Sequence, residues 1–533
     1  MSQTKNERRA FAAIIAILLM ASVVACGGNP QSNGGGQSGV AETPKIAYYA
    51  TNSEPILDWD PSVEFSNGII IMHNIYETLL RYLPDRDDFE YVLATGYDRS
   101  ADGLEWTFDI RQGVKFHDGT ELDADAVKFS FDRTIEKDEG AAFIWDAVDY
   151  IEVLDKYKLK IVLDYAVPLD LVVASGYAAF IMSPTAVQNN GDDWLSSGNV
   201  AGTGPYTVRS SIHGEEVVLE AFDDYWQGWD GNHTRLAYIK KVPETASRRQ
   251  LIESGEASFI LQVTPEDHAA LRDVPGIIVE DQTSYQNLLL FFNNQKAPLN
   301  DARVRQALSY AFPYSDVIDH IMAGEAIQGR GIIPQGLWGH GSDIFQYSYD
   351  LDKAKSLLAD AGYPDGGFSL SATYTAGDEA HRRSLELYHS ELAKIGITLD
   401  IRGMPWDSQW EAAKVDPEQA QDIFVMYWWP DYASPYSWLV NLFFTEDDTL
   451  FNMSYYSNPL VDDLIDEGNV LSGIDRNAGA SAFIEAQKII MQDAAAIPIF
   501  DQQYVRIYRD NFKGYKDNPA YSNVVFFYET YID

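Results

Sequence analysis

The residue types that usually carry out covalent chemistry are scarce in this sequence. The chain has one cysteine among 533 residues, which excludes an intrachain disulfide, a multi-cysteine zinc site and a CxxC redox motif. The motifs HExxH, GxSxG and GxxxxGK[ST] do not occur, so the usual signatures of zinc proteases, α/β-hydrolases and P-loop ATPases are missing. A secreted hydrolase built on paired carboxylates stays open, because 80 residues are acidic and sequence does not show spatial pairs. We expect no enzyme, no cofactor and no metal site.

The single cysteine indicates attachment of the protein to a membrane rather than a catalytic role. Lys5, Arg8 and Arg9 precede an uncharged run at 10–25, and Cys26 follows at once. The run is shorter than the about 20 residues of a membrane span and has the order of a secretory signal. The sequence before Cys26 resembles the bacterial lipobox, so we expect a signal peptide at 1–25, lipidation of Cys26 and a flexible tether at 26–43. An uncleaved anchor with a buried cysteine is the alternative.

Composition places the rest of the chain among globular proteins. Apolar residues make up 46% and charged residues 22%, which is typical of folded domains. Lys and Arg total 39 against 80 Asp and Glu, a net charge of −41. A nucleic-acid partner is therefore not expected, since such proteins need a basic surface to neutralise phosphates.

Local patterns predict a mixed α/β body. Alternation of apolar and polar residues predicts a hairpin at 206–221 that turns at His213-Gly214. Helical spacing predicts helices that begin after Asp301 and Asp350, and another around 385–395 that is followed by a strand at 397–401. Strand signals dominate the first half, and helices alternate with strands over 291–500. Four glycines, at 113, 119, 202 and 204, are interpreted as turn residues with positive φ.

Five stretches, in order, resemble the family 5 extracellular solute-binding proteins, the peptide-, dipeptide- and nickel-binding components of ABC importers. They are WTFDIRQGVKFHDGT at 106–120 continued by DAVKFS at 125–130, GTGPY at 202–206 with DYW at 224–226, LNDARVRQAL at 299–308, LDKAK to AGYP at 351–364, and PDYASP at 430–435. Each stretch alone is a weak signal, but five in register are specific. The resemblance covers about residues 44–533.

The resemblance implies a type II periplasmic-binding-protein fold: two α/β lobes joined by a hinge, with an extra subdomain in lobe I. It implies the following division of the chain: lobe I at 44–81, 200–290 and 501–533, the insert subdomain at 82–199, and lobe II at 291–500. The chain would then cross between the lobes near Phe291–Phe292 and near Phe500–Asp501.

The resemblance also implies a ligand site between the lobes. Asp431 matches the position that pairs with the ligand's α-ammonium in peptide-binding relatives, a charge-assisted bond that a neutral ligand cannot make. Trp428 and Trp406 match positions that pack on the ligand, and Trp429 lies between Trp428 and the aspartate. Each of these residues has a structural alternative: a salt-bridged or capping loop for the aspartate, and ordinary core for each tryptophan.

Three further groups complete the predicted site. Glu64, Phe65 and Ser66 correspond to an early loop whose backbone can pair with an extended peptide, and Gln502 follows the second crossing. The arginine that holds the ligand carboxylate in dipeptide binders is replaced by Thr375. Nearby His381 and Arg382, with Arg383, are the alternative source of the cation, unless they form a solvated helix face.

The functional expectation is a lipid-anchored, extracytoplasmic receptor that captures peptides and delivers them to an ABC permease with separate ATPase subunits. We expect a monomer. The tryptophan-rich loop and the missing arginine clamp keep an oligosaccharide or another non-peptide solute open as the alternative ligand. A nickel chelate is less favoured, because no close cluster of His, Asp and Glu supports it.

Overall fold

The computed structural model describes residues 45–533, apart from the side chain of Asp192. The predicted signal peptide, Cys26 and the tether lie outside the described residues. Residues 44–533 form one compact unit. No helix within 45–533 combines the length and the apolar character needed to cross a membrane.

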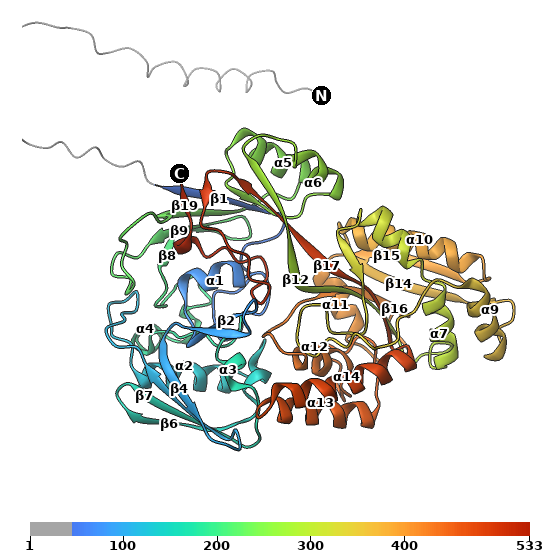
Figure 1. Ribbon diagram of the computed structural model, residues 1–533, viewed down its shortest axis with the longest axis horizontal. Coiled ribbons are helices and arrows are strands. Elements are labelled where there is room, and N and C mark those ends of the chain that lie inside the picture. Colours follow the sequence, from blue (N-terminus) through green and yellow to red (C-terminus); the bar gives the residue numbers. More distant parts are fainter. Residues whose placement is uncertain (1–44) are drawn as a thin grey trace, which may run out of the picture. The chain divides into compact units, whose positions relative to one another are not determined.

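An 11-stranded sheet runs through both lobes, in the order β15-β14-β16-β12-β17-β11-β1-β10-β9-β8, with β13 added beside β17. The long antiparallel strands β12 and β17 lie in the middle of this order (Figure 1). We call the part on the side of β11, β1, β10, β9 and β8 lobe I, and the part on the side of β16, β14 and β15 lobe II. The strands are β1 (Ile46–Thr51), β8 (Tyr206–Ile212), β9 (Glu216–Ala221), β10 (Leu236–Lys241), β11 (Phe259–Ile260), β12 (Ile277–Phe292), β13 (Ala326–Gln328), β14 (Ser369–Thr375), β15 (Thr398–Met404), β16 (Ile423–Trp428) and β17 (Ala496–Arg509).

The pairing of β12 with β17 breaks where the two strands pass between the lobes. Thr283 pairs with Gln503 and Asn287 with Asp501, so three residues of β12 face a single residue of β17. Such an irregularity bends a strand and interrupts its ladder of hydrogen bonds. Ser284 donates from its hydroxyl to the carbonyl of Gln502 across this break. The two strands thus stay bonded through a side chain where the backbone ladder is interrupted.

The rest of lobe I consists of short helices and small hairpins. Its hairpin at 206–221 is confirmed as β8 and β9. The additional elements are α1 (Ile69–Ile75), β2 (Leu80–Leu83), β3 (Asp88–Tyr91), α5 (Thr245–Ser254), α6 (Pro265–Leu271), β18 (Phe512–Lys513), η4 (Phe527–Glu529) and β19 (Tyr531–Ile532).

The insert has its own four-stranded antiparallel sheet, ordered β4-β5-β7-β6. Trp106 and Phe108 of β5 are buried at 1% and 0% exposure, which anchors this sheet in the core. The elements are β4 (Ala94–Arg99), β5 (Glu105–Ile110), α2 (Ala124–Lys137), η1 (Ala142–Trp145), β6 (Val148–Asp155), β7 (Lys158–Leu163), α3 (Leu169–Val172), α4 (Pro184–Asn190) and η2 (Asp192–Trp194).

Lobe II contains most of the helices, and its predicted helix starts are confirmed. Asp301 and Asp350 cap α7 and α9 by accepting from the backbone N–H of Arg303 and Lys353, which satisfies a donor that a helix start leaves unpaired. The helices are α7 (Ala302–Tyr310), α8 (Tyr314–Asp316), η3 (Val317–Ile321), α9 (Leu351–Asp360), α10 (Glu379–Ala393), α11 (Trp406–Ala413), α12 (Tyr436–Phe443), α13 (Pro459–Ser472) and α14 (Arg476–Asp493).

The four predicted turn glycines divide into two pairs. Gly113 and Gly119 have φ of +77° and +83°, as expected. Gly202 and Gly204 do not have positive φ, so that part of the interpretation is wrong. A Cβ at Gly202 would lie 2.1 Å from the carbonyl oxygen of Ile75, and one at Gly204 would lie 2.6 Å from it. The GTGPY turn needs its glycines because it packs against the backbone at the end of α1.

Candidate functional site

Asp431 is a half-buried residue whose carboxylate is bonded only to neutral donors. It follows β16 and faces the start of α12, where the Ser437 hydroxyl and the Asn441 amide donate to its Oδ2 at 2.8 and 3.1 Å. Its own backbone N–H donates to the Ser437 hydroxyl at 3.0 Å. Burial raises the pKa of Asp431 to about 6, although these hydrogen bonds act in the opposite direction. The carboxylate is therefore held in place without a charge to balance it.

The backbone of Asp431 also joins the two lobes. Its carbonyl oxygen accepts from the Ser175 hydroxyl at 2.8 Å and from the N–H of Gly176 at 3.2 Å. Both donors come from the segment that follows α3 of the insert. These two bonds and those of Tyr177 in the next paragraph join the lobes through neutral groups. We call them, together with the adjacent Asp431 carboxylate, the inner contact.

Tyr177 brings Trp429 and Ser66 together. The indole N–H of Trp429 donates to the Tyr177 hydroxyl at 3.3 Å, and this hydroxyl donates to the carbonyl of Ser66 at 2.8 Å. Burial first, and then the nearby carboxylates of Glu64 and Asp431, raise the pKa of the Tyr177 hydroxyl far above its ordinary value. The hydroxyl is therefore a neutral donor and acceptor between the two lobes. Ser66 and Trp429 of the predicted site, together with the backbone of Asp431, meet at this contact.

The Glu64 carboxylate fixes the backbone of the early loop through hydrogen bonds. Its carboxylate accepts from the backbone N–H groups of Asp58, Ser66 and Gly68 at 2.9, 2.7 and 3.1 Å. The side chain is 4% exposed, so these internal bonds use its acceptor capacity. Phe65 is 50% exposed, and its ring lies beside Gly140 of the insert. In this loop Glu64 fixes the backbone, while Phe65 and the backbone of Ser66 are on its surface.

The two matched tryptophans belong to one aromatic cluster of lobe II. Trp428 lies 5.7 Å from Phe451, which lies 5.4 Å from Trp410, and Trp410 lies 5.1 Å from Trp406, all between ring centroids. Trp406 is 41% exposed, so one end of the cluster faces solvent. The buried indole N–H of Trp428 has no hydrogen-bond partner. An apolar surface with one unpaired donor suits stacking against a ligand.

His381 and Trp428 lie on opposite faces of the sheet. Trp428 pairs in register with Asn287, whose side chain receives a bond from Trp438 of α12. The preceding Tyr427 points to the other face, where its ring lies 4.7 Å from that of His381 in α10. His381 is 1% exposed, neither ring nitrogen has a partner, and burial lowers its pKa. It is thus a neutral core residue, separated from Asp431 by the sheet.

Arg382, Thr375 and Gln502 lie in three different surroundings. Arg382 is on the exposed side of α10 and pairs with Glu379 and Glu386, each at 2.6 Å, as a solvated helix face would. The Thr375 hydroxyl donates to Gln409 at 3.0 Å. Gln502 lies at the break between β12 and β17, and its buried Oε1 has no partner.

A second set of bonds, the outer contact, joins the lobes away from Asp431. Arg476, at the start of α14, pairs with Asp87 at 2.6 Å and with Asp170 of α3 at 3.1 Å. Arg99 of β4 donates to the carbonyls of Gly473 and Ile474 at 2.6 and 3.4 Å. In Figure 1 α3 lies beside the layer formed by α13 and α14. This contact is charged, whereas the inner contact joins the lobes through neutral groups.

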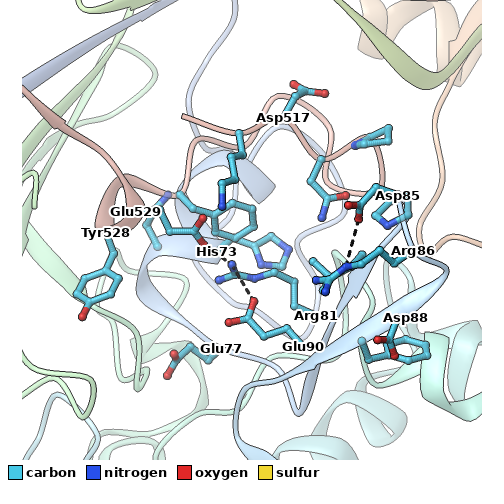
Figure 2. Close-up of a pocket in the computed structure, with 18 of the residues that line it drawn as sticks. His73, Glu77, Arg81, Asp85, Arg86, Asp88, Glu90, Asp517, Tyr528 and Glu529 are labelled. Carbon is cyan, nitrogen blue, oxygen red and sulfur yellow. Dashed lines mark hydrogen bonds and ion pairs between the residues drawn. The ribbon is translucent and has the colours of Figure 1, made fainter. Parts of the chain in front are cut away.

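A cavity of about 920 Å³ is lined mostly by lobe I, and also by β12 and by Gly336 of the stretch assigned to lobe II. None of the predicted site residues lines it. Figure 2 shows Arg81 in this cavity between Glu90 and Glu529, with which it pairs at 3.3 and 2.5 Å. Glu77 is bonded there by the side chains of Thr203, Tyr225 and Trp226, and burial raises its pKa to about 7. These partners satisfy Arg81 and Glu77, and the cavity is separate from the site predicted around Asp431.

Sequence reasoning missed Tyr177 and Ser175, because they lie in an apolar stretch with no motif. The only available signal is the local run Ser175-Gly176-Tyr177 within otherwise buried aliphatic residues. Within residues 45–533, no group of three or more His, Cys, Asp and Glu side chains is arranged to hold a metal ion.

Known proteins resemble the chain over nearly its whole length. The chain is 29% identical to the probable D,D-dipeptide-binding periplasmic protein DdpA of Escherichia coli K12, over 87% of this chain and 90% of that protein. It is 27% identical to heme-binding protein A of Haemophilus influenzae, over 88% and 90%. Among solved structures, the periplasmic binding protein DppA of Helicobacter pylori in complex with the peptide STSA matches with a TM-score of 0.81 and 26% identity, over 91% and 98%.

Residues 88–449 match the bacterial extracellular solute-binding proteins, family 5. This match covers more than half of the chain, and it agrees with the two-lobed α/β fold and with relatives that are binding proteins rather than enzymes. The chain therefore belongs to the family 5 extracellular solute-binding proteins, the extracytoplasmic binding components of ABC importers.

Proposed function

We propose that this protein captures peptides between its two lobes and delivers them to an ABC permease. The observation that carries the proposal is Asp431, a half-buried residue at the contact between the lobes whose carboxylate has only neutral partners. Such a group is poorly stabilised by itself and gains a charge-assisted bond from a ligand ammonium. The peptide-bound relative from Helicobacter pylori and the dipeptide-binding relative from Escherichia coli support peptides as the ligand class.

The lobes would close around the ligand when it binds. The break in pairing at 284–286 of β12, opposite Gln502, is the proposed hinge, because strands bend most easily where the ladder is interrupted. Ligand binding would shift the equilibrium towards the closed form by its higher affinity for that form. Trp428, Trp429, Trp406, Phe65, the backbone of Ser66 and Gln502 are the proposed ligand contacts beside Asp431.

The domain division and the membrane anchor also remain proposals. Lobe I would comprise 44–81, 200–290 and 501–533, with the insert at 82–199 and lobe II at 291–500. A lipid on Cys26 would keep the binding unit at the membrane near the permease.

A non-peptide solute is the second candidate. It is supported by the relative that is named a heme-binding protein and by the exposed end of the tryptophan cluster at Trp406. Titration of the purified protein with tripeptides and with glucan oligosaccharides, followed by tryptophan fluorescence and calorimetry, separates the two. Saturable binding of peptides alone supports the proposal, whereas saturable binding of glucans alone would replace it with the second candidate.

A further inference from the structure

The cavity shown in Figure 2 lies beside the break in the pairing of β12 and β17. Its wall includes Thr283 and Tyr285 of β12 and Gly336 of lobe II. The Tyr285 hydroxyl donates to the Gly336 carbonyl at 3.4 Å, and a Cβ at Gly336 would lie 3.1 Å from Cγ2 of Thr283. The volume of about 920 Å³ falls within the about 300–1,000 Å³ of small-molecule sites. A molecule bound there would contact both lobes and a strand that joins them.

One arginine on the cavity wall is shared by two glutamates. The Arg81 guanidinium pairs with Glu529 at 2.5 Å and with Glu90 at 3.3 Å, and each glutamate uses a single oxygen in this pairing. The guanidinium also lies 3.9 Å from the ring centroid of Phe526, which fixes its position further. The wall therefore carries one negative charge more than Arg81 balances.

The other charged residues of the wall do not supply the missing positive charge. Arg86 lies 3.9 Å from Asp85, and both side chains are exposed. Asp517 pairs at 2.5 Å with Arg506, which does not line the cavity, and Lys516 is exposed. Six lining residues are Asp or Glu and three are Lys or Arg. With Arg506 counted as a fourth cation, two carboxyl groups remain in excess.

Two titratable groups lie deeper in the wall. Glu77 is 7% exposed and accepts hydrogen bonds from hydroxyl and indole groups, and burial raises its pKa to about 7. His73 is 8% exposed, its Nε2 has no hydrogen-bond partner, and burial and then Arg81 lower its pKa to about 3. A neutral imidazole can accept a hydrogen bond from an ammonium group, and a nearby cation favours the ionised form of Glu77. Both groups would be stabilised by a cation in the cavity.

A metal ion does not fit these groups. In the described part of the chain, no three side chains of His, Cys, Asp or Glu are arranged to hold one. The excess carboxyl groups are instead spread over the wall, with Glu77 buried and with Glu90 and Glu529 partly exposed. The wall also includes the aromatic rings of Phe526 and Tyr528, and such rings attract organic cations.

We propose that this cavity is a binding site, separate from the one around Asp431, for a linear organic cation that carries at least two amines. One ammonium group would lie near Glu77 and His73, and the other near Glu90 and Glu529. This proposal does not depend on the peptide function, because no residue proposed to contact a peptide lines the cavity.

The test titrates the purified protein by calorimetry with three five-carbon molecules: 1,5-diaminopentane, pentylamine and 1,5-pentanediol. The titrations are made at pH 7 in about 0.15 M salt, which screens general attraction of cations to an acidic protein. We expect saturable binding of the diamine, at least about fivefold weaker binding of pentylamine, and no binding of the diol. Since Glu77 is about half protonated at pH 7, binding of the diamine should release up to about half a proton. Titrations in buffers of different ionisation enthalpy measure this release.

Three variants locate the diamine. Glu529→Gln leaves Arg81 paired with Glu90, so the wall keeps an ion pair, and it should weaken binding of the diamine at least about fivefold. Glu152→Gln is the matched control, because it removes an exposed carboxylate of β6 that does not line the cavity, and it should leave the affinity unchanged. Asp431→Asn should still bind the diamine, since Asp431 lies outside the cavity. Thermal unfolding of each variant checks that it is folded.

Four results would each overturn the proposal. They are no saturable binding of the diamine, a diol that binds as tightly, equal effects of Glu529→Gln and Glu152→Gln, and binding without release of protons. Loss of diamine binding in Asp431→Asn would also reject it, because the diamine would then occupy the site between the lobes.

Discussion

The inner and outer contacts join the same two lobes with opposite chemistry. The outer contact consists of Arg476 with Asp87 and Asp170, and of Arg99 with two carbonyl groups. The inner contact consists of hydroxyl, indole and amide groups around the half-buried Asp431. In the outer contact charge is balanced within the protein, whereas in the inner contact one charge is left over.

This difference indicates which contact is available to a ligand. Asp87, half of an ion pair, has a side chain that is 58% exposed, so water and salt weaken that bond. Asp431 is half-buried and has no ion-pair partner among the described residues. Under the proposed function, closure at the outer contact would proceed without a ligand, while closure at the inner contact would be completed by a cation of the ligand.

The largest expected effect comes from neutralising one carboxylate in each contact. Asp431→Asn should weaken binding of Ala-Ala-Ala amide at least about tenfold, because the charge-assisted bond is lost. Asp87→Asn is the matched control, since asparagine tolerates the positive φ of 46° at that position. Its affinity should stay within about threefold of the unchanged protein by calorimetry, because an exposed ion pair contributes about 0.2–1 kcal/mol. Equal losses in both variants would remove the distinction between the contacts.

The second largest effect should be the pH dependence of binding, which distinguishes the inner contact from the outer contact. With a pKa of about 6 in the free protein, Asp431 is about one-tenth ionised at pH 5, so affinity for an amine should be about tenfold lower there than at pH 7. The raised pKa also means that the contribution of Asp431 to stability is fully present below about pH 4 and is lost as pH rises through about 6. Calorimetry at pH 5 and at pH 7 checks the expected difference in affinity.

Asp431→Asn is the control for that experiment, because other carboxyl groups titrate in the same range. Asp146 has a pKa raised to about 6, and Glu77 and Asp501 have pKa values raised to about 7. If the residual affinity of Asp431→Asn falls as steeply between pH 7 and pH 5 as that of the unchanged protein, the titrating group is not Asp431.

Removing the Tyr177 hydroxyl should have a smaller effect. Tyr177→Phe deletes the bond from Trp429 and the bond to the Ser66 carbonyl, each contributing about 0.5–1.5 kcal/mol. We expect an affinity loss of about fivefold with little change in thermal stability, measured by calorimetry and by thermal unfolding. A fall in unfolding temperature with unchanged affinity would make Tyr177 a core residue rather than part of the ligand-dependent closure.

The smallest effect is expected at the outer contact. Arg476→Gln removes two ion pairs that together contribute about 1 kcal/mol at low salt, and less as the ionic strength rises. Its unfolding free energy should therefore differ from that of the unchanged protein more at 20 mM than at about 0.5 M salt. A salt-independent difference would show that Arg476 acts through packing.

Local sequence signals predicted the elements of the fold but not their contacts. Asp301 and Asp350 predicted helix starts because a cap needs only its own chain neighbours. Gly202 and Gly204 were misinterpreted because the Ile75 carbonyl that excludes a side chain at these positions is distant in sequence. The same limitation applies to the lobe contacts, where Tyr177 and Trp429 are joined across 252 positions.

The family resemblance supplied the candidate positions but not the face of the sheet on which each one lies. Asp431 lies at the contact between the lobes, as the resemblance indicated. His381 lies near Trp428 in space, but the alternation of Tyr427 and Trp428 along β16 places it on the other side of the sheet. Sequence distance carries no information about which face of a sheet a distant helix covers.

The role of Asp431 in holding an amine-bearing peptide can be tested by mass spectrometry of the purified protein under native and then denaturing conditions. The unchanged protein and Asp431→Asn are measured side by side. We expect the unchanged protein to release peptides that carry an amine, and we expect these peptides to be absent from Asp431→Asn. A ligand without an amine, or one that both proteins retain equally, would contradict this role of Asp431.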